Sequence, residues 1–274
     1  MSDKVAFITG ASRGIGACTA VALAEAGYKV ALTARTLNAG EGHEHGSVGS
    51  NTSPLPGSLS ETAQRVQAAG SEALCLRSDI LDPDSMAAAW QQAIDHFHHV
   101  DLLFNNACYQ GPGNMQRLLD VTPQQLHRIY QGNVFTPLQL VQLALPGMVA
   151  RGRGTVINMV SGSALNEPPA PADEGGWGFA YPSSKAALIR MAGSIKAEHP
   201  AAGLKVFNVE PGFVMTEVMR DNGLDDAIAQ RFNPTAPETV AKVIRWLAED
   251  EQAIEQMKYA VTFAPQLAAK LGLQ

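Results

Sequence analysis

The sequence predicts an α/β protein in which a doubly wound parallel sheet of about seven strands lies between two layers of helices, three layers in all. Short apolar runs alternate with helical patterns along the chain, which is typical of this class. The first run leads directly into a glycine-rich turn and a helix. Neither an internal repeat nor a linker divides the 274 residues, so we expect one domain over residues 1–274.

The strands of the sheet are predicted by apolar, β-rich runs. They are expected at 4–9, 29–33, 73–77, 100–104, 154–159, 205–209 and 259–263. The helices between them follow capping or turn signals. These helices are expected at 15–26, 58–70, 82–98, 123–149, 182–199 and 235–249, with a short helix in the tail.

Two helix starts have the spacing of a capping box, Ser58 with Glu61 and Thr235 with Glu238. Three stretches interrupt the regular pattern. Residues 36–57 and 165–179 are predicted to be long insert loops, and 213–234 is predicted to be a mobile, Met-rich loop next to the substrate.

Composition narrows the possible functions. The formal charge of −6 argues against a nucleic-acid-binding protein, which usually carries a basic stripe. The longest apolar runs are too short to span a bilayer, and residues 1–4 lead into the first strand without a cleavable signal pattern. The three cysteines, Cys18, Cys75 and Cys108, are an odd number and form no CxxC. We therefore expect a reducing, cytoplasmic location and neither nucleic acid nor membrane as a partner.

The turn after the first strand reads Thr9-Gly10-Ala11-Ser12-Arg13-Gly14-Ile15-Gly16. Glycines permit a tight turn and let the backbone approach a pyrophosphate at the N-terminus of the following helix. The strand, turn and helix together predict a dinucleotide site. The alternative is a glycine turn that binds nothing.

The strand expected at 29–33 ends at Ala34-Arg35, where a Rossmann unit faces the adenine ribose. An acidic residue there would hold the 2′-hydroxyl, but the next carboxylate is Glu41. Arg13 and Arg35 are therefore candidates to clamp a 2′-phosphate, which favours NADP(H) over NAD(H). The alternative is two solvated arginines. The 36–57 loop is expected to border this end of the cofactor.

Further polar residues follow strands that end at the same edge of the sheet. Asp79, followed by Ile80, is placed to reach the adenine, and the paired Asn105-Asn106 can bond neighbouring backbone. Ser161 and Ser163 follow the strand expected at 154–159, at the side where open α/β sheets bind ligands.

Asn133 lies in the middle of the helix expected at 123–149, where asparagine is unfavourable. We expect either a local kink or a side chain turned toward a buried partner, with an exposed asparagine as the alternative. His43 and His45 are interpreted as solvated or phosphate-facing, because no further Cys or His clusters with them. No metal site is predicted.

Tyr181 and Lys185 are four residues apart and so share one face of a helix. An ammonium held there favours the phenolate and lowers the pKa of the tyrosine. Such a phenol can give a proton to a carbonyl oxygen or take one from an alcohol. The alternative is a surface tyrosine and lysine that happen to share a helix.

Taken in order, these motifs resemble those of the short-chain dehydrogenase/reductase family. The resemblance covers Lys4 to about Glu249. It rests on the 9–16 turn, Asp79, Asn105-Asn106-Ala107, Asn133, Ser161, Tyr181-x-x-x-Lys185 and Pro211-Gly212.

The resemblance implies four catalytic residues. Tyr181 would be the acid/base, and Lys185 would lower its pKa and bind the nicotinamide ribose. Ser161 would hold the substrate oxygen, with Ser163 as a second candidate, and Asn133 would position a water behind Lys185.

The cofactor set implied by the resemblance and by the arginine pair is large. It comprises Gly10, Ser12, Arg13, Gly14, Ile15, Gly16, Arg35, Asp79, Ile80, Asn105, Ala107, Tyr181, Lys185, Pro211, Gly212, Val214 and Thr216.

The implied function is an NADP(H)-dependent oxidoreductase that interconverts a ketone or aldehyde and an alcohol by direct hydride transfer. An apolar substrate of moderate size is expected beside Ser161, Ser163 and Tyr181. Its apolar contacts would be Trp177, Phe213, Met215 and Met219. The alternatives are an NAD-dependent dehydrogenase of the same family and a silent NADP-binding scaffold. A homodimer or homotetramer is also implied.

Three features depart from the family pattern. Cys108 stands where a glycine usually allows close approach of the backbone to the cofactor. Ser161 and Tyr181 are twenty residues apart, more than is usual, so the 165–179 segment is expected to form a wall over the substrate. The usual glycine-rich C-terminal strand is replaced by residues 259–274.

Overall fold

A computed structural model of the chain describes residues 4–46, 50–221, 223–224 and 233–273. Their seven strands form one parallel sheet in the order β3-β2-β1-β4-β5-β6-β7. The strands are β1 Lys4–Thr9, β2 Tyr28–Ala34, β3 Ala73–Arg77, β4 Leu102–Asn105, β5 Gly154–Met159, β6 Leu204–Glu210 and β7 Thr262–Phe263. The order reverses between β1 and β4, which confirms the doubly wound α/β prediction.

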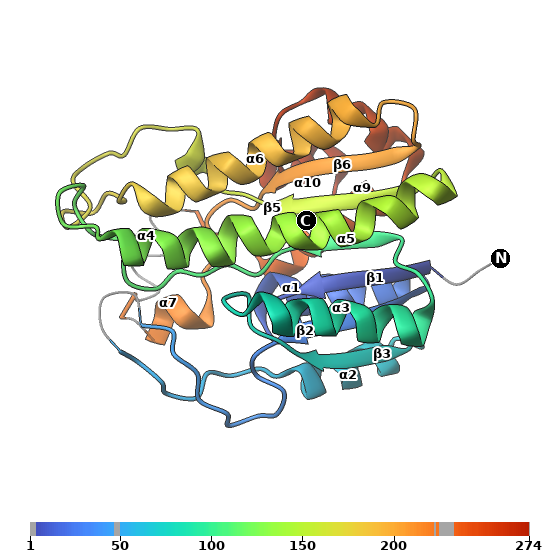
Figure 1. The fold of residues 1–274 in the computed structure, drawn as a ribbon, viewed down its shortest axis with the longest axis horizontal. Helices are drawn as coiled ribbons and strands as arrows, with labels where there is room; N and C mark the ends of the chain where they lie inside the picture. Colours follow the sequence, from blue (N-terminus) through green and yellow to red (C-terminus); the bar gives the residue numbers. More distant parts are fainter. Residues whose placement is uncertain (1–3, 47–49, 222, 225–232, 274) are drawn as a thin grey trace.

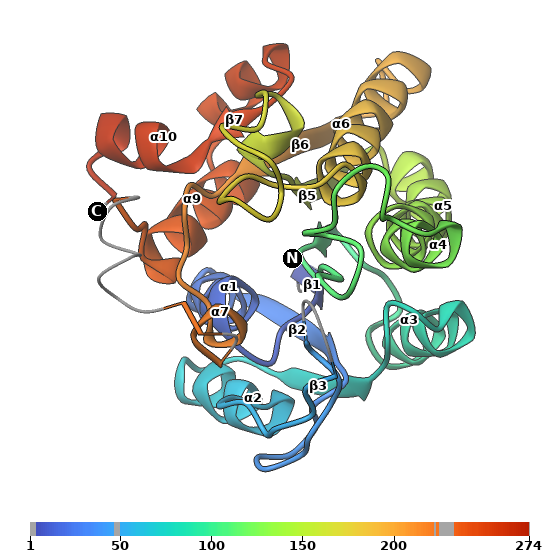
Figure 2. The same cartoon turned by 90° about the vertical axis from the view of Figure 1, so that its left-hand side faces the viewer.

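Helices cover both faces of the sheet (Figures 1 and 2). One face carries α1 Gly14–Glu25, α2 Leu59–Ala68, α9 Pro237–Glu249 and α10 Ala264–Leu271. The other carries α3 Pro83–Phe97, α4 Pro123–Tyr130, α5 Thr136–Arg151 and α6 Ala180–Glu198. Buried aliphatic and aromatic side chains form a separate core against each face, because both faces of a parallel sheet are buried.

The predicted start of α2 is confirmed, since the Ser58 side chain accepts a hydrogen bond from the Glu61 backbone N–H. The predicted Thr235–Glu238 capping box is wrong. Ala236 is the N-cap of α9 and Pro237 opens the helix. Proline drives its preceding residue into the extended region, and Thr235 instead donates its N–H to Phe213 O at 2.7 Å.

The helix predicted at 123–149 is divided by a π-helical turn, Gln131–Phe135, between α4 and α5. The turn carries Asn133, whose side chain is buried, with 1% of the residue exposed. A π turn adds a residue to the helix and here presents the asparagine to the interior. The prediction of a buried partner is confirmed, and the alternative of an exposed asparagine is wrong.

The segment after β2 leaves the sheet and passes next to α7, Glu217–Asp221 (Figure 1). An antiparallel bridge joins Gly42 to Pro54, and His45 N donates to Asn51 O at 2.9 Å. The 36–57 loop therefore doubles back on itself.

Much of the Met-rich stretch predicted to be mobile, residues 222 and 225–232, lies outside the described residues. None of the described helices has the length and apolarity that crossing a membrane requires.

Candidate active site

The carboxyl ends of the strands meet at one edge of the sheet, which faces the viewer in Figure 2. The glycine turn follows β1, Arg35 follows β2, Asn105 ends β4 and Ser161 follows β5. Three strand spacings separate β2 from β5 in the sheet, which is roughly 14 Å. The arginine end and the serine end of the predicted site are therefore well separated along this edge.

The glycine turn forms an open cradle. Gly10 and Gly14 have φ of 68° and 52°, a region that favours glycine. A Cβ at Gly16 would overlap the carbonyl oxygen of Gly10. Helix α1, which follows, has no side-chain cap and no acidic residue in its first turn. Its first N–H groups and the positive end of its dipole suit a pyrophosphate, so this turn fits a dinucleotide.

The paired asparagines have different roles. Asn106 Nδ2 donates to Thr9 O at 2.9 Å and Gly10 O at 3.2 Å, which ties β4 to the glycine turn. Asn105 Nδ2 donates to Asn158 Oδ1 at 3.0 Å on the neighbouring strand. Asn105 Oδ1 is buried without a hydrogen-bond partner among the described residues. An orphaned acceptor is costly to bury, so its place at the β4 end suits a ligand donor.

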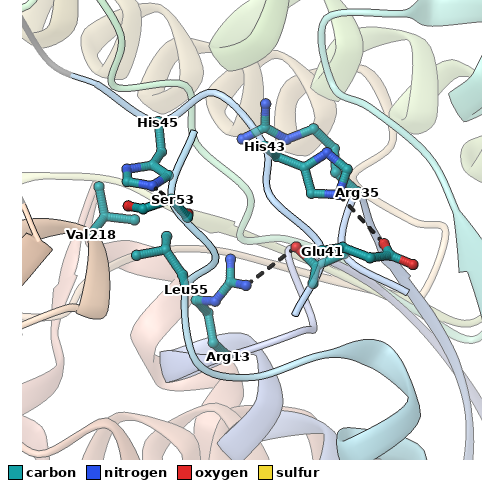
Figure 3. Close-up of a pocket in the computed structure, with 9 residues that line it drawn as sticks. Arg13, Arg35, Glu41, His43, His45, Ser53, Leu55 and Val218 are labelled. Carbon is teal, nitrogen blue, oxygen red and sulfur yellow. Dashed lines mark hydrogen bonds and ion pairs between the residues drawn. The ribbon is translucent and has the colours of Figure 1, made fainter. Parts of the chain in front are cut away.

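A shallow, open pocket lies at the end of the edge that follows β2 (Figure 3). Its lining comprises Arg13, Arg35, Thr36, Glu41, His43, His45, Ser53, Leu55 and Val218. The structure thus brings Arg13 and Arg35 together, and the 36–57 loop borders them as expected. This pocket is not at the predicted reaction centre, because Tyr181, Ser161 and Lys185 are absent from its lining.

Arg13 is fixed in that pocket by the loop. Its guanidinium donates to Pro56 O at 2.8 Å, Gly57 O at 3.0 Å and Thr36 Oγ1 at 3.2 Å. Burial lowers the pKa of Arg13, and the neighbouring charge of Arg35 lowers it further while Glu217 opposes both. Two adjacent guanidinium groups repel each other, so an anion between them would be stabilised.

Glu41 also lines the pocket, although the sequence suggested that this carboxylate was remote. Arg77 NH2 donates to Glu41 Oε1 at 2.7 Å, and this bond does most to lower the pKa of Glu41, to about 2. His43 lies 3.5 Å from Glu41 Oε2, and His45 Nε2 lies 3.1 Å from Ser53 O. Both histidines therefore border the arginine pocket.

Asp79 is engaged with its own turn. Its carboxylate accepts from Leu81 N at 2.9 Å, and its backbone N–H donates to Ser85 Oγ at 3.0 Å. The carbonyl oxygen of Ile80 accepts from Thr136 Oγ1 at 2.7 Å. This turn is therefore anchored to α3 and α5. Ser12 is buried and Ile15 half-buried in the glycine turn, and Ala107 N donates to Thr9 Oγ1 at 3.0 Å.

The side chain of Tyr181 is half-buried at the start of α6. It is hydrogen-bonded with the side chains of Gln110, Ser161 and Cys108. Ser161 Oγ in turn lies 3.0 Å from Ser163 Oγ, so both candidate serines share one network. The sequence analysis identified Cys108 only as a residue that replaces the usual glycine. It did not predict that Cys108 or Gln110 would contact Tyr181. The adjacency of β4 and β5 in the sheet is the signal that could have found them.

Lys185 is almost fully buried, with 2% of the residue exposed. Its Nζ donates to Met159 O at 2.8 Å and lies 5.7 Å from the centroid of the Tyr181 ring. The predicted lowering of the tyrosine pKa is wrong for this structure. Burial raises the pKa of Tyr181 and the Cys108 thiol raises it further, while hydrogen bonds from Gln110 and Ser161 oppose them.

Asn133 joins the loop after β4 to α6. Its Oδ1 accepts from Tyr109 N at 2.7 Å, and its Nδ2 donates to Tyr109 O and Ser184 Oγ at 3.2 Å each. Ser184 Oγ donates to Tyr181 O at 2.7 Å. Asn133 therefore holds the backbone that carries Cys108 and Gln110 against the helix of Tyr181. Ser184 was missed by sequence reasoning, although it lies inside the Tyr-x-x-x-Lys motif.

The remaining predicted residues follow β6. Gly212 has φ of 75°, and its N–H donates to Glu210 Oε2 at 3.0 Å, while Pro211 is half-buried. Val214 is buried, and Thr216 Oγ1 accepts from Met219 N at 3.3 Å. Phe213 and Met215 are half-buried in the same stretch.

The 165–179 segment is bound to the loop after β4. Arg117 pairs with Asp173 and Glu174 at 2.7 Å each, and Gly178 N donates to Asn114 O at 3.0 Å. Trp177 is half-buried next to this junction. The loop after β4 and the segment between Ser161 and Tyr181 are thus joined to each other.

Comparison with known proteins agrees with this geometry. A family model described as short chain dehydrogenase matches residues 4–45 and 41–227. The chain belongs to the short-chain dehydrogenase family. A short chain dehydrogenase of Monascus purpureus is 30% identical over 256 residues, 91% of this chain and 77% of that protein. A 3-oxoacyl-[acyl-carrier-protein] reductase of Staphylococcus aureus is 27% identical, over 90% of this chain and 92% of that protein.

Solved structures of short-chain dehydrogenases share the fold. A metagenomic short-chain oxidoreductase in complex with NADP is 25% identical with a TM-score of 0.69, over 95% of this chain and 94% of that one. A short chain dehydrogenase from Mycobacterium paratuberculosis bound to NAD is 25% identical with a TM-score of 0.72, over 95% of each chain. The protein is therefore an oxidoreductase of the short-chain dehydrogenase/reductase family, whose neighbours bind NADP or NAD.

Proposed function

We propose that this protein interconverts a ketone or aldehyde and an alcohol with NADP(H), using Tyr181 as the acid/base. The observation that carries the proposal is the hydrogen-bonding of the Tyr181 side chain with Ser161, one helical turn from buried Lys185. A binding scaffold would have no need of a phenol placed in this way. The whole chain would be one catalytic domain, since the seven described strands belong to one sheet.

The cofactor, when bound, supplies or accepts the hydride. The glycine turn, with Gly10, Ser12, Gly14, Ile15 and Gly16, would hold the pyrophosphate. Asp79 and Ile80 would border the adenine. Asn105, Ala107 and the 211–216 stretch would line the nicotinamide end, together with Lys185.

The protein's own side chains would have two tasks in this reaction, orientation of the substrate oxygen and proton transfer. Ser161, bonded to both Ser163 and Tyr181, would orient the substrate oxygen. Tyr181 would donate a proton to that oxygen during reduction, or remove one during oxidation. Because burial raises the pKa of Tyr181, the phenol would keep the proton that reduction uses over a wide pH range.

Replacing Tyr181 with phenylalanine tests the acid/base role. Turnover of an activated ketone should fall about 100-fold or more, the usual scale for a lost acid–base group, while cofactor affinity stays near normal. Tyr259→Phe is the matched control, because Tyr259 is exposed in the C-terminal part of the chain. Retained turnover in Tyr181→Phe would refute the assignment. Absence of any turnover in the unaltered protein would favour the silent scaffold.

The preference for NADP(H) rests on Arg13 and Arg35 in one pocket. NADPH should bind at least about tenfold more tightly than NADH at fixed salt, a difference of about 1.4 kcal/mol. Side-by-side titration by calorimetry measures both affinities. Equal or tighter binding of NADH would support the alternative, an NAD-dependent dehydrogenase, to which Glu41 in the pocket and the NAD-bound relative point.

The substrate would be an apolar carbonyl compound or alcohol of moderate size. Trp177, Phe213 and Met215 are half-buried in the segments that precede α6 and follow β6, and with Met219 they would supply the apolar contacts.

A cytoplasmic location is proposed from three cysteines that form no disulfide. We also propose a homodimer or homotetramer.

A further inference from the structure

The carboxylate of Glu41 is unusually well supplied with donors for a loop residue. Its Oε1 accepts from Arg77 NH2 at 2.7 Å and Asn38 Nδ2 at 3.2 Å, and its Oε2 accepts from Leu37 N at 3.0 Å. His43 Nε2 lies 3.5 Å from Oε2. Most of the acceptor capacity of the carboxylate is therefore used at the edge of the arginine pocket.

Arg77 reaches Glu41 from the next strand of the sheet. It ends β3, in register with Ala34 of β2, and its NH1 donates to the carbonyl oxygen of Arg35 at 3.3 Å. A single guanidinium thus spans the backbone of Arg35 and the carboxylate of Glu41. The planar guanidinium offers a separate N–H donor to each of these two acceptors.

Arg35, the other arginine of the pocket, differs from Arg13 and Arg77 in its contacts. Within the part of the chain that the structure describes, its guanidinium has no hydrogen-bond or ion-pair partner, although Glu41 lines the same pocket. Without Arg77, the strongest donor to Glu41 would be lost. The carboxylate could then turn toward Arg13 and Arg35 and neutralise them. It would also repel a phosphate and accept a hydrogen bond from a ribose hydroxyl.

We propose that Arg77 is a positioning residue that sets the cofactor preference by binding the Glu41 carboxylate at the edge of the Arg13/Arg35 pocket, so that the carboxylate does not turn toward the two arginines. Arg77 would act without touching the cofactor. The inference rests on the proposed function, in which this pocket receives the 2′-phosphate of NADP(H). It adds that the preference depends on a contact between β3 and the 36–57 loop.

A double-mutant cycle tests the inference by direct binding. NADPH and NADH affinities are measured by calorimetry for the unaltered protein, Arg77→Met, Glu41→Gln and the double variant. Arg77→Met should weaken NADPH binding about tenfold and leave NADH within about twofold, as expected for a carboxylate brought near a phosphate. Adding Glu41→Gln to Arg77→Met should restore most of the NADPH affinity, because the repelling charge is then absent.

Two further variants separate the inference from simpler explanations. Arg77→Lys should retain part of the preference, because the ammonium still neutralises Glu41. Arg65→Met, which removes an exposed arginine from α2, should change neither affinity. Thermal unfolding of each variant checks that it is folded.

The outcomes distinguish the inference from the proposed function. If the unaltered protein prefers NADPH and Arg77→Met leaves the ratio of affinities unchanged, only the inference is overturned. If Glu41→Gln fails to rescue Arg77→Met, Arg77 acts through its own charge and the inference is again overturned. If the unaltered protein does not prefer NADPH, the proposed NADP(H) function fails.

Discussion

The Tyr181 side chain depends on residues from separate segments of the chain. Cys108 and Gln110 follow β4, Ser161 follows β5, and Tyr181 itself opens α6. The turn forms with a cysteine at position 108, and its two neighbours are anchored, Ala107 N to Thr9 Oγ1 and Tyr109 N to Asn133 Oδ1. The departure from the usual glycine therefore places a thiol next to the proposed acid/base.

Glu41 gives a residue-scale prediction for stability. Its pKa is lowered to about 2, first by Arg77, whereas the unfolded value is about 4.3. A carboxyl group with a depressed pKa stabilises the fold above its unfolded pKa, and that contribution is lost as pH falls toward 2. The difference in urea midpoint between the unaltered protein and Glu41→Gln should therefore shrink from pH 7 to pH 3.

The Arg77→Met background provides the control for this measurement. Without the guanidinium, Glu41→Gln should have a much smaller effect at pH 7. A difference in midpoint that is constant from pH 7 to pH 3 would contradict the assigned cause of the pKa shift.

At the scale of elements, the 36–57 loop and α7 are held together at Asp221. Asn51 Nδ2 donates to Asp221 Oδ2 at 2.6 Å, Ser53 Oγ donates to it at 2.9 Å, and His45 lies 3.8 Å away. These contacts lower the pKa of Asp221, first through Ser53 and then through Asn51. The insert loop thus connects the arginine pocket to the segment that follows β6.

Removal of the Asp221 carboxylate should loosen that connection. In Asp221→Ala, limited proteolysis should cleave the 36–57 loop about threefold faster, the scale of a partly exposed hydrogen-bonded contact. Asp173→Ala is the matched control, because it breaks a contact of the 165–179 segment with Arg117 instead. Equal cleavage in Asp221→Ala and the unaltered protein would show that the loop is held by other contacts.

At the scale of the whole molecule, the two helical layers differ in what they leave exposed. The π turn and α5 expose Phe135, Leu138 and Leu143 on the outside of one layer. Apolar side chains gathered on one helix are typical of a contact between subunits. They support the proposed homo-oligomer with this layer at its interface.

Light scattering measures the assembly directly. The unaltered protein should have two or four times the mass of one chain, and Leu138→Glu should reduce that mass by burying a charge in the interface. Leu119→Glu is the control, since Leu119 is 96% exposed and lies outside α5. A monomeric unaltered protein would rule out the proposed assembly.

The sequence by itself determined the order and type of the elements and the local motifs. Alternating apolar runs, the glycine turn and the Tyr181/Lys185 spacing depend on neighbours along the chain, and their physical consequences are local. Only the tertiary structure decided which side chains meet. Arg77 contacts Glu41 because β3 pairs with β2, and Gln110 reaches Tyr181 because the loop after β4 packs on α6. Lys185 faces the carbonyl oxygen of Met159 because α6 covers the end of β5. These contacts join segments distant in sequence, so no local pattern encodes them.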